Sequence, residues 1–206
     1  MTGIQITGCS PSRPRDTAPG AAERPAATAS PGSRVLLAYF SRPGENYSYG
    51  GRTNLKTGNT EVLARMIGGH IECDMHRIEA ADPYSDDYDA TVARNVREQD
   101  TDARPAIANP PASIDGYDVV MLASPIWNVR APMIMSAFAE RYDFSAKTVH
   151  PVTTHAMSGL GTTERDYAAS CPGATLGEGV AVRGEEVRDA DAEVRSWLRR
   201  IGLLQN

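Results

Sequence analysis

Three short segments of the chain place hydroxyl, amide and glycine residues directly after apolar runs. The first is Thr57-Gly58-Asn59-Thr60, which precedes a helical pattern. Backbone N–H groups and hydroxyls at the start of a helix bind anions, and the helix dipole favours negative charge there. We therefore expect a phosphate site at this point, with Gly58 letting the backbone approach the ligand. The alternative is an ordinary helix N-cap formed by Thr57 or Asn59.

The second segment, residues 124–132, contains Trp127, one of only two tryptophans. A large aromatic side chain on a loop after a strand is not needed for the core. A planar heteroaromatic ligand that stacks on this indole would gain roughly 1–3 kcal/mol. The alternative is that Trp127 only packs its loop onto the edge of a sheet.

The third segment, residues 154–163, has two glycines, several hydroxyls and His155. A loop of small residues lets a flat ligand lie against the backbone, where N–H groups can meet its oxygen atoms. The alternative is a flexible connector. Each of the three segments is weak evidence for a binding site by itself. The evidence is stronger if the fold brings the three segments together.

Apolar runs and helical periodicity alternate along the chain, and this order predicts how the three segments are placed. Strands are predicted at residues 34–40, 75–80, 117–123, 147–153 and 179–182, and helices at 59–68, 85–99, 132–141, 164–169 and from 187 to 201. This alternation indicates an α/β fold, a doubly wound open five-stranded parallel sheet with helices on both faces. Ligands bind beyond the carboxyl ends of the strands in such sheets, so the three segments should converge.

Composition excludes several classes of protein. The 206 residues carry a formal net charge of -5, which argues against nucleic acid as a partner. No run of about 20 apolar residues is present to span a membrane. Three cysteines are too few for a disulfide scaffold. No metal site is expected at His70, Cys73 and His76, because a helix end and the next strand would direct these side chains apart.

Residues 1–33 differ from the rest. Proline, alanine, serine and threonine dominate residues 10–33, which predicts a disordered tether before a domain at residues 34–206. Ile6-Thr7-Gly8-Cys9 resembles a bacterial lipobox, although most of a signal peptide is absent. Either the true start lies upstream, or Cys9 is an incidental thiol. The expected location is the cytoplasm, or a membrane surface outside it if Cys9 is lipidated.

Five stretches in the order of the predicted elements resemble the flavodoxin family, in a branch with an extended first loop. They read VLLAYFSR, TGNTEVLARMI, ADPYSDDYDA, YDVVMLASPIWNVRAPMIMSAF and TTHAMSGLGTT, and they cover most of residues 34–201. The resemblance implies a five-stranded flavodoxin fold and non-covalent FMN.

The resemblance also implies roles for individual residues. Those corresponding to the phosphate loop are Ser41, Thr57, Gly58, Asn59 and Thr60, those covering the isoalloxazine ring are Pro125, Ile126 and Trp127, and those on its other side are Thr154, His155, Ser158, Gly159 and Gly161. Asn128 is a candidate contact at flavin N5 and O4. His155 is expected near the pyrimidine end, where an imidazolium would stabilise the reduced anion.

The chain departs from the family pattern in two places. Residues 43–56 are inserted between Ser41 and the TGNT element, and we expect them to fold over the flavin as a partial lid. Asn128 and Val129 replace the second aromatic residue and glycine that commonly follow the tryptophan. In flavodoxins a peptide beside flavin N5 often flips when the ring takes up a proton, and glycine makes this flip easy. Asparagine tolerates the positive φ that the flip requires, whereas valine does so only at a cost. The departure therefore affects the tuning of the flavin's redox behaviour more than FMN binding.

The leading hypothesis is an FMN-binding redox protein that passes electrons to a partner protein or reduces a small-molecule acceptor such as a quinone. No residue is identified as a catalytic acid or base, and the oligomeric state is not determined. One alternative is a flavodoxin-fold binding module that has lost flavin. Another is a surface protein attached through Cys9.

Overall fold

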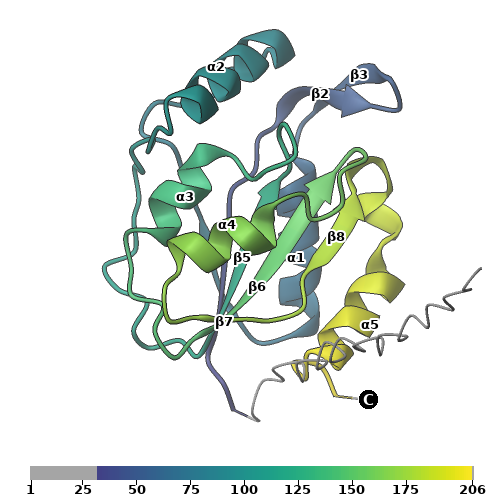
Figure 1. Cartoon of the computed structure of the whole chain (residues 1–206). Helices are drawn as coiled ribbons and strands as arrows, with labels where there is room; N and C mark the ends of the chain where they lie inside the picture. The colour runs from purple at the N-terminus through teal and green to yellow at the C-terminus, as the bar shows by residue number, and fades with distance from the viewer. Residues whose placement is uncertain (1–31, 206) are drawn as a thin grey trace, which may run out of the picture.

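The apolar run after residue 34 forms a central strand of a parallel sheet in the computed structural model, which describes residues 32–205 (Figure 1). β1 (Val35–Tyr39) lies between β4 (Asp74–Arg77) and β5 (Val119–Pro125), and β6 (Thr148–His155) follows β5. These pairings are parallel, which confirms the predicted sheet. Cys9 and nearly all of the predicted tether lie outside the described residues.

The fifth position of the sheet is divided between two short strands. β7 (Thr175–Leu176) pairs with the start of β6, and β8 (Val180–Arg183) pairs with its end. Between them the carbonyl of Glu178 accepts a hydrogen bond from Trp197 Nε1 at 3.1 Å and lies 2.8 Å from His150 Nδ1. A Cβ atom at Gly177 would overlap the His150 ring. The strand is therefore interrupted where two buried rings bind its backbone.

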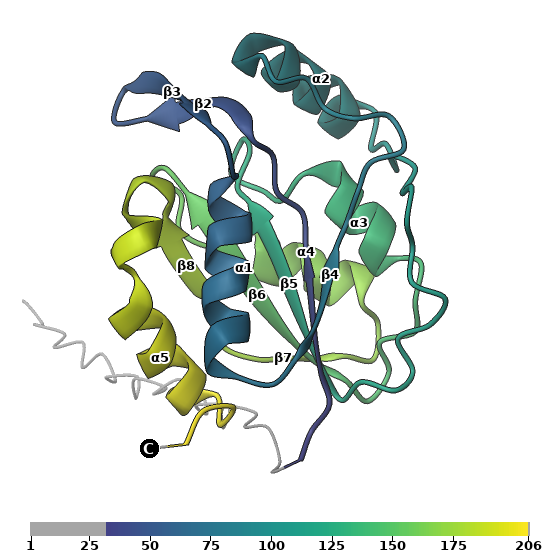
Figure 2. The same cartoon turned by 180° about the vertical axis from the view of Figure 1, so that it is seen from behind.

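Helices cover both faces of the sheet (Figures 1 and 2). α1 (Asn59–His70) and α5 (Asp191–Arg200), preceded by the 3-10 helix η1 (Gly184–Asp189), pack on one face, and α3 (Met133–Ala139) and α4 (Thr163–Ser170) pack on the other. The strands divide their side chains between the two layers. Leu37 and Met121 belong to the core under α1 and α5, whereas Leu36 and Leu122 belong to the other core.

α2 (Tyr88–Asp100) covers neither face. It stands beyond the carboxyl ends of the strands beside a hairpin of β2 (Gly44–Ser48) and β3 (Gly51–Leu55), which forms where the sequence predicted only a loop (Figures 1 and 2). Val92 and Val96 of this helix are 37% and 39% exposed. The polar residues of α2 are buried instead, because the helix packs against a polar site.

Two further differences concern α1 and the segment after it. The helix was predicted to stop at Gly68-Gly69 but continues to His70, because its packing on the sheet outweighs a cost of about 1 kcal/mol per helical glycine. His70 Nε2 lies 2.6 Å from Asp191, while the His76 ring stacks on Phe138 on the opposite face. These side chains diverge, as expected.

No helix within residues 32–205 has both the length and the apolar character needed to cross a bilayer.

The stability of the folded protein is expected to fall in mild acid. Burial lowers the pKa of His150 below its ordinary value of 6.5, and burial also lowers the pKa of His76. Below about pH 6.5 the unfolded chain takes up protons that the folded protein resists, so the free energy of unfolding decreases as pH falls. The slope approaches at most about 1.4 kcal/mol per pH unit for each histidine.

Urea denaturation between pH 7.5 and pH 5 measures this slope. His150→Phe retains a ring beside Gly177 but removes one titrating group, so its slope should be shallower than that of the original protein. Equal slopes would show that His150 does not contribute.

Candidate functional site

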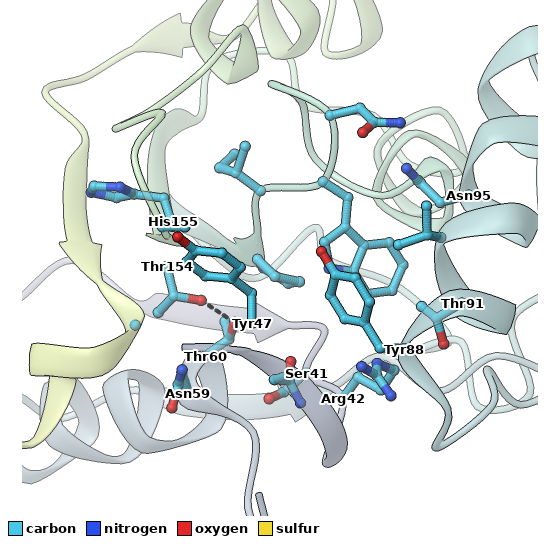
Figure 3. Close-up of a pocket in the computed structure, with 18 of the residues that line it drawn as sticks. Ser41, Arg42, Tyr47, Asn59, Thr60, Tyr88, Thr91, Asn95, Thr154 and His155 are labelled. Carbon is cyan, nitrogen blue, oxygen red and sulfur yellow. Dashed lines mark hydrogen bonds between the residues drawn. The ribbon is translucent and has the colours of Figure 1, made fainter. Parts of the chain in front are cut away.

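A cavity of about 310 Å³ opens at the carboxyl ends of β1, β5 and β6 (Figure 3). This volume falls in the range of sites for small organic ligands. Its wall comes from the three loops that the sequence singled out, together with α2, the hairpin and η1. The lining residues are Ser41, Arg42, Asn46, Tyr47, Asn59, Thr60, Tyr88, Thr91, Val92, Asn95, Pro125, Ile126, Trp127, Asn128, Thr154, His155, Ala156, Met157, Gly184 and Glu185.

The start of α1 is open toward the cavity. Gly58 is the N-cap residue, and neither Thr57 nor Asn59 caps the helix with its side chain, so the alternative of an ordinary cap by these residues is wrong. Ser41 Oγ accepts a hydrogen bond from the N–H of Glu61 at 3.0 Å. Among the described residues, the N–H groups of Asn59 and Thr60 have no partner. Free donors at a helix start form an anion site.

Tight packing holds this helix start in place. A Cβ atom at Gly58 would overlap Ser41 Oγ and lie 2.5 Å from the carbonyl oxygen of Arg42. Thr60 Oγ1 lies 2.7 Å from Thr154 Oγ1, which joins α1 to the end of β6 (Figure 3). Because Gly58 has no side chain, the first loop can pack directly against the start of α1. Neither Gly58 nor Thr57 lines the cavity.

Arg42 is buried beside the same loop. Its guanidinium donates to the carbonyls of Ser85 at 2.8 Å, Asp86 at 3.2 Å and Glu45. Burial lowers its pKa, against the opposing charge of Asp86. These bonds tie the base of the hairpin to the segment before α2, so Arg42 builds the wall in addition to lining it.

Trp127 packs its loop onto the protein, as one interpretation of the sequence predicted, and stacking of a ligand on its ring stays a prediction. Its ring makes perpendicular contacts with Phe40 and Tyr84, with centroid distances of 5.7 and 5.3 Å. Tyr84 is itself held by a 2.7 Å hydrogen bond to Glu98. The indole thus packs its loop onto the protein and also lines the cavity, in an orientation set before any ligand arrives.

Asn128 and Val129 form a tight turn after Trp127. The N–H of Trp127 donates to the carbonyl of Arg130 at 2.8 Å, and φ is +47° at Asn128 and +63° at Val129. Positive φ at both central residues defines a type I′ turn, which favours asparagine first and glycine second. Val129 is a β-branched residue in the left-handed region, so the turn stores strain beside the cavity.

Replacing Val129 with glycine is expected to stabilise the ligand-free protein by about 1 kcal/mol. Relief of left-handed strain contributes ~1–3 kcal/mol, and the greater chain entropy of glycine offsets part of it. Val129 is 58% exposed, so little packing is lost. Urea denaturation measures the change. Val129→Ala retains a Cβ in the strained conformation and should give no comparable gain; equal gains would mean that backbone strain is not the cause.

The third loop contributes to the cavity mainly through its beginning. Thr154, His155, Ala156 and Met157 line the wall, whereas Ser158, Gly159 and Gly161 do not. A Cβ atom at Gly161 would overlap the carbonyl oxygen of Val129, and Thr162 N–H donates to that oxygen at 2.8 Å. These residues pack the third loop on the second. A ligand contact through them remains a prediction.

His155 differs electrostatically from the expectation. Burial lowers its pKa, and the neighbouring charge of Arg183 lowers it further. The neutral imidazole is therefore favoured near pH 7, and the imidazolium proposed to stabilise a reduced anion is not. In Figure 3 the ring points away from Tyr47 and the centre of the site.

Several cavity residues were not identified from the sequence. Asn46 and Tyr47 come from the hairpin, Tyr88 and Asn95 from α2, and Glu185 from η1. Figure 3 shows Tyr47 and Tyr88 in the middle of the site, on opposite sides of Ser41. For Asn46 and Tyr47 the sequence predicted only that the inserted residues 43–56 would fold over the site. For α2 the available signal was the helical spacing of Tyr88, Thr91 and Asn95 at i, i+3 and i+7, which places them on one face.

Contacts with α2 and with η1 hold the hairpin over the site. Arg52 binds Asp89 at 2.6 Å and lies 4.6 Å from the centre of the Tyr88 ring. At the tip, Tyr49 N–H donates to Glu185 Oε1 at 2.9 Å. The inserted residues thus form one wall of the cavity.

Comparisons with known proteins agree with this fold. The flavodoxin family model matches residues 52–201. A candidate flavoprotein from Bacteroides eggerthii is 29% identical, with a TM-score of 0.66 over 82% of this chain and 98% of that one. A second, from Bacteroides uniformis, is 27% identical with the same TM-score, over 82% of this chain and 99% of that one.

A flavoprotein from Lactobacillus acidophilus, solved in complex with FMN, shares the fold at 15% identity. Its TM-score is 0.56, over 76% of this chain and 97% of that one. No curated protein matches the chain.

Proposed function

Because the chain belongs to the flavodoxin family, we propose that its cavity binds FMN without a covalent bond and that the protein is a redox flavoprotein. The observation that carries the proposal is the meeting of two features in one cavity. The start of α1, where the N–H groups of Asn59 and Thr60 have no partner among the described residues, opens into the same space that Trp127 lines. A flat ring system with a phosphate is the ligand that needs both.

The residues present fit the parts of this cofactor. The phosphate would accept hydrogen bonds from the N–H groups of Asn59 and Thr60 and from nearby hydroxyls, with the α1 dipole favouring its charge. The isoalloxazine ring would lie between the loops that carry Trp127 and Thr154. When bound, FMN supplies one- and two-electron transfer, while the protein sets its environment.

The walls of the cavity favour a small-molecule reductase over a carrier between proteins. A carrier must present the flavin edge to a docking partner. Here Tyr47 from the hairpin and Tyr88 from α2 stand at the site, and Glu185 holds the hairpin tip. These walls leave space for a small acceptor and hinder close approach by a second protein.

An absorption spectrum and a titration test the proposal. The purified protein should take up FMN, show a band near ~450 nm that only a flavin provides, and quench FMN fluorescence at micromolar protein. No quenching and no colour after incubation with FMN would instead support a binding module that has lost flavin.

The role of the hairpin can be tested by deleting residues 43–56. The loaded variant should oxidise faster in air or change its preference among small acceptors during NADPH oxidation, because one wall of the site is gone. If the preference among acceptors and the rate of oxidation in air were both unchanged, the hairpin would not control access to the flavin.

A further inference from the structure

We propose that α2 and the hairpin form a separate subsite for the electron acceptor, and that Asn95 donates a hydrogen bond to a carbonyl oxygen of a flat aromatic compound bound there. This inference rests on the proposed FMN site and extends it to the substrate. The walls of the cavity fall into two groups. The loops after β1, β5 and β6 serve the cofactor, and a second set of residues from α2 and β2 faces them.

Asn95 is an unusual residue for its position. Asn95 is only 2% exposed, whereas Val96, the next residue on the same helix, is 39% exposed. Its Oδ1 accepts a hydrogen bond from Gln99 Nε2 at 3.3 Å, and no bond from Nδ2 exists among the described residues. Asn95 lines the cavity, so its amide nitrogen is free to donate a hydrogen bond to a ligand oxygen bound there.

Gln99 determines which way the Asn95 amide points. Gln99 Nε2 also donates to the carbonyl of Trp127 at 3.1 Å, so this nitrogen must face Asn95 as a donor. The Asn95 oxygen is therefore turned to Gln99, and its NH₂ group is turned into the cavity (Figure 3). A network of neighbours, rather than the ligand, fixes the donor in place.

Two aromatic rings line the same cavity as this donor. Tyr47 and Tyr88 line the cavity from the hairpin and from α2, and neither hydroxyl has a hydrogen-bond partner among the described residues. Flat rings bind flat rings by offset stacking or edge contacts, and free hydroxyls can donate to a second carbonyl. The side chain of Val92 adds an apolar surface.

These features together select a class of acceptor. Aromatic walls suit a planar apolar molecule, and donors directed inward suit carbonyl oxygens, so a quinone fits better than a metal ion or a carboxylate. A hydrogen bond from Asn95 would strengthen as negative charge develops on the carbonyl oxygen during reduction. The overall reaction converts a quinone, a reduced nicotinamide and a proton into the hydroquinone and the oxidised nicotinamide.

The test compares Asn95→Asp with the unchanged protein, both loaded with FMN. Aspartate keeps the oxygen that accepts from Gln99 but replaces the donor with an acceptor. Binding of 1,4-naphthoquinone to the oxidised protein, without any reductant, is followed by the flavin difference spectrum. We expect at least tenfold weaker quinone binding, with a matching rise in KM during NADPH oxidation, and an FMN dissociation constant within twofold of the original.

Asn95→Leu serves as a second variant that removes the donor without adding charge, and should weaken quinone binding in the same direction. Val96→Ala is the matched control on the same helix, since Val96 is exposed and does not line the cavity. It should leave both constants unchanged.

Two results would overturn the subsite. Unchanged quinone binding in both Asn95 variants would remove the donor role. Loss of FMN affinity by the same factor as quinone affinity would make Asn95 a cofactor ligand instead. If the original protein bound no FMN, the proposed function itself would fail, which is a distinguishable outcome.

Discussion

Replacing Gly58 by alanine should weaken FMN binding about 100-fold. The added Cβ overlaps Ser41 Oγ and approaches the carbonyl of Arg42, so α1 must move away from the first loop. Losing good geometry at two N–H groups that face a charged phosphate costs about 3 kcal/mol, which corresponds to that factor. Overpacking should also lower the free energy of unfolding by ~1–3 kcal/mol. Flavin fluorescence quenching measures the first effect, and urea denaturation measures the second.

Gly69→Ala is the matched control for this variant. Gly69 lies on the same helix, and a Cβ there would meet no atom within 4 Å. Alanine should stabilise the helix by up to ~1 kcal/mol and leave FMN affinity unchanged. If both variants reduced affinity equally, the close approach at Gly58 would not be the cause.

Replacing Trp127 by alanine should raise the FMN dissociation constant about 10- to 100-fold. Stacking on an aromatic face contributes ~1–3 kcal/mol, and the variant also removes the ring that Phe40 and Tyr84 hold in place. Trp127→Phe should lie between the original and the alanine variant, because a smaller ring keeps part of the contact. Isothermal titration with FMN provides the measurement.

Trp197 supplies a control that separates binding from stability. It is fully buried on the side of α5 that packs against the sheet, and it does not line the cavity. Trp197→Phe should lower the free energy of unfolding while leaving the FMN dissociation constant unchanged. In that variant Trp127 is the remaining tryptophan, so quenching of its emission by FMN reports directly on the site. Equal losses of FMN affinity on replacing either tryptophan would argue for general destabilisation.

Part of the site was predictable from the sequence. The loops after β1, β5 and β6, which form the cofactor side of the cavity, depend on local patterns in the chain. Strands such as Val35–Tyr39 and Val119–Pro125 are continuous apolar runs, and parallel strands place their carboxyl ends together. The loops that begin at Ser41, Pro125 and Thr154 therefore converge, as predicted, on one cavity. The alternation of strands and helices was enough to predict this without any knowledge of side-chain packing.

The acceptor half was not predictable, because it depends on contacts between segments distant in the chain. The sequence predicted a helix at residues 85–99, but its period alone does not show which face would pack against the rest of the protein. Contacts of the hairpin with Asp86 and Asp89 instead place α2 over the strand ends, so Asn95 faces inward and Val96 outward. The sequence around Thr57 was likewise compatible with two helix starts, one capped by Thr57 or Asn59 and one with free N–H groups. The structure has the second, with Gly58 as the N-cap residue packed tightly against the first loop.

The amino-acid sequence by itself determined the parallel sheet, the helices on its two faces and the three loops at the cofactor site. These follow from hydrophobic period and from the geometry of parallel strands, which are properties of short segments. The division of the fifth strand, the lowered pKa of His155 and the inward face of α2 became apparent only in the three-dimensional structure. Each depends on burial and hydrogen bonds between residues far apart in sequence, which no local pattern records.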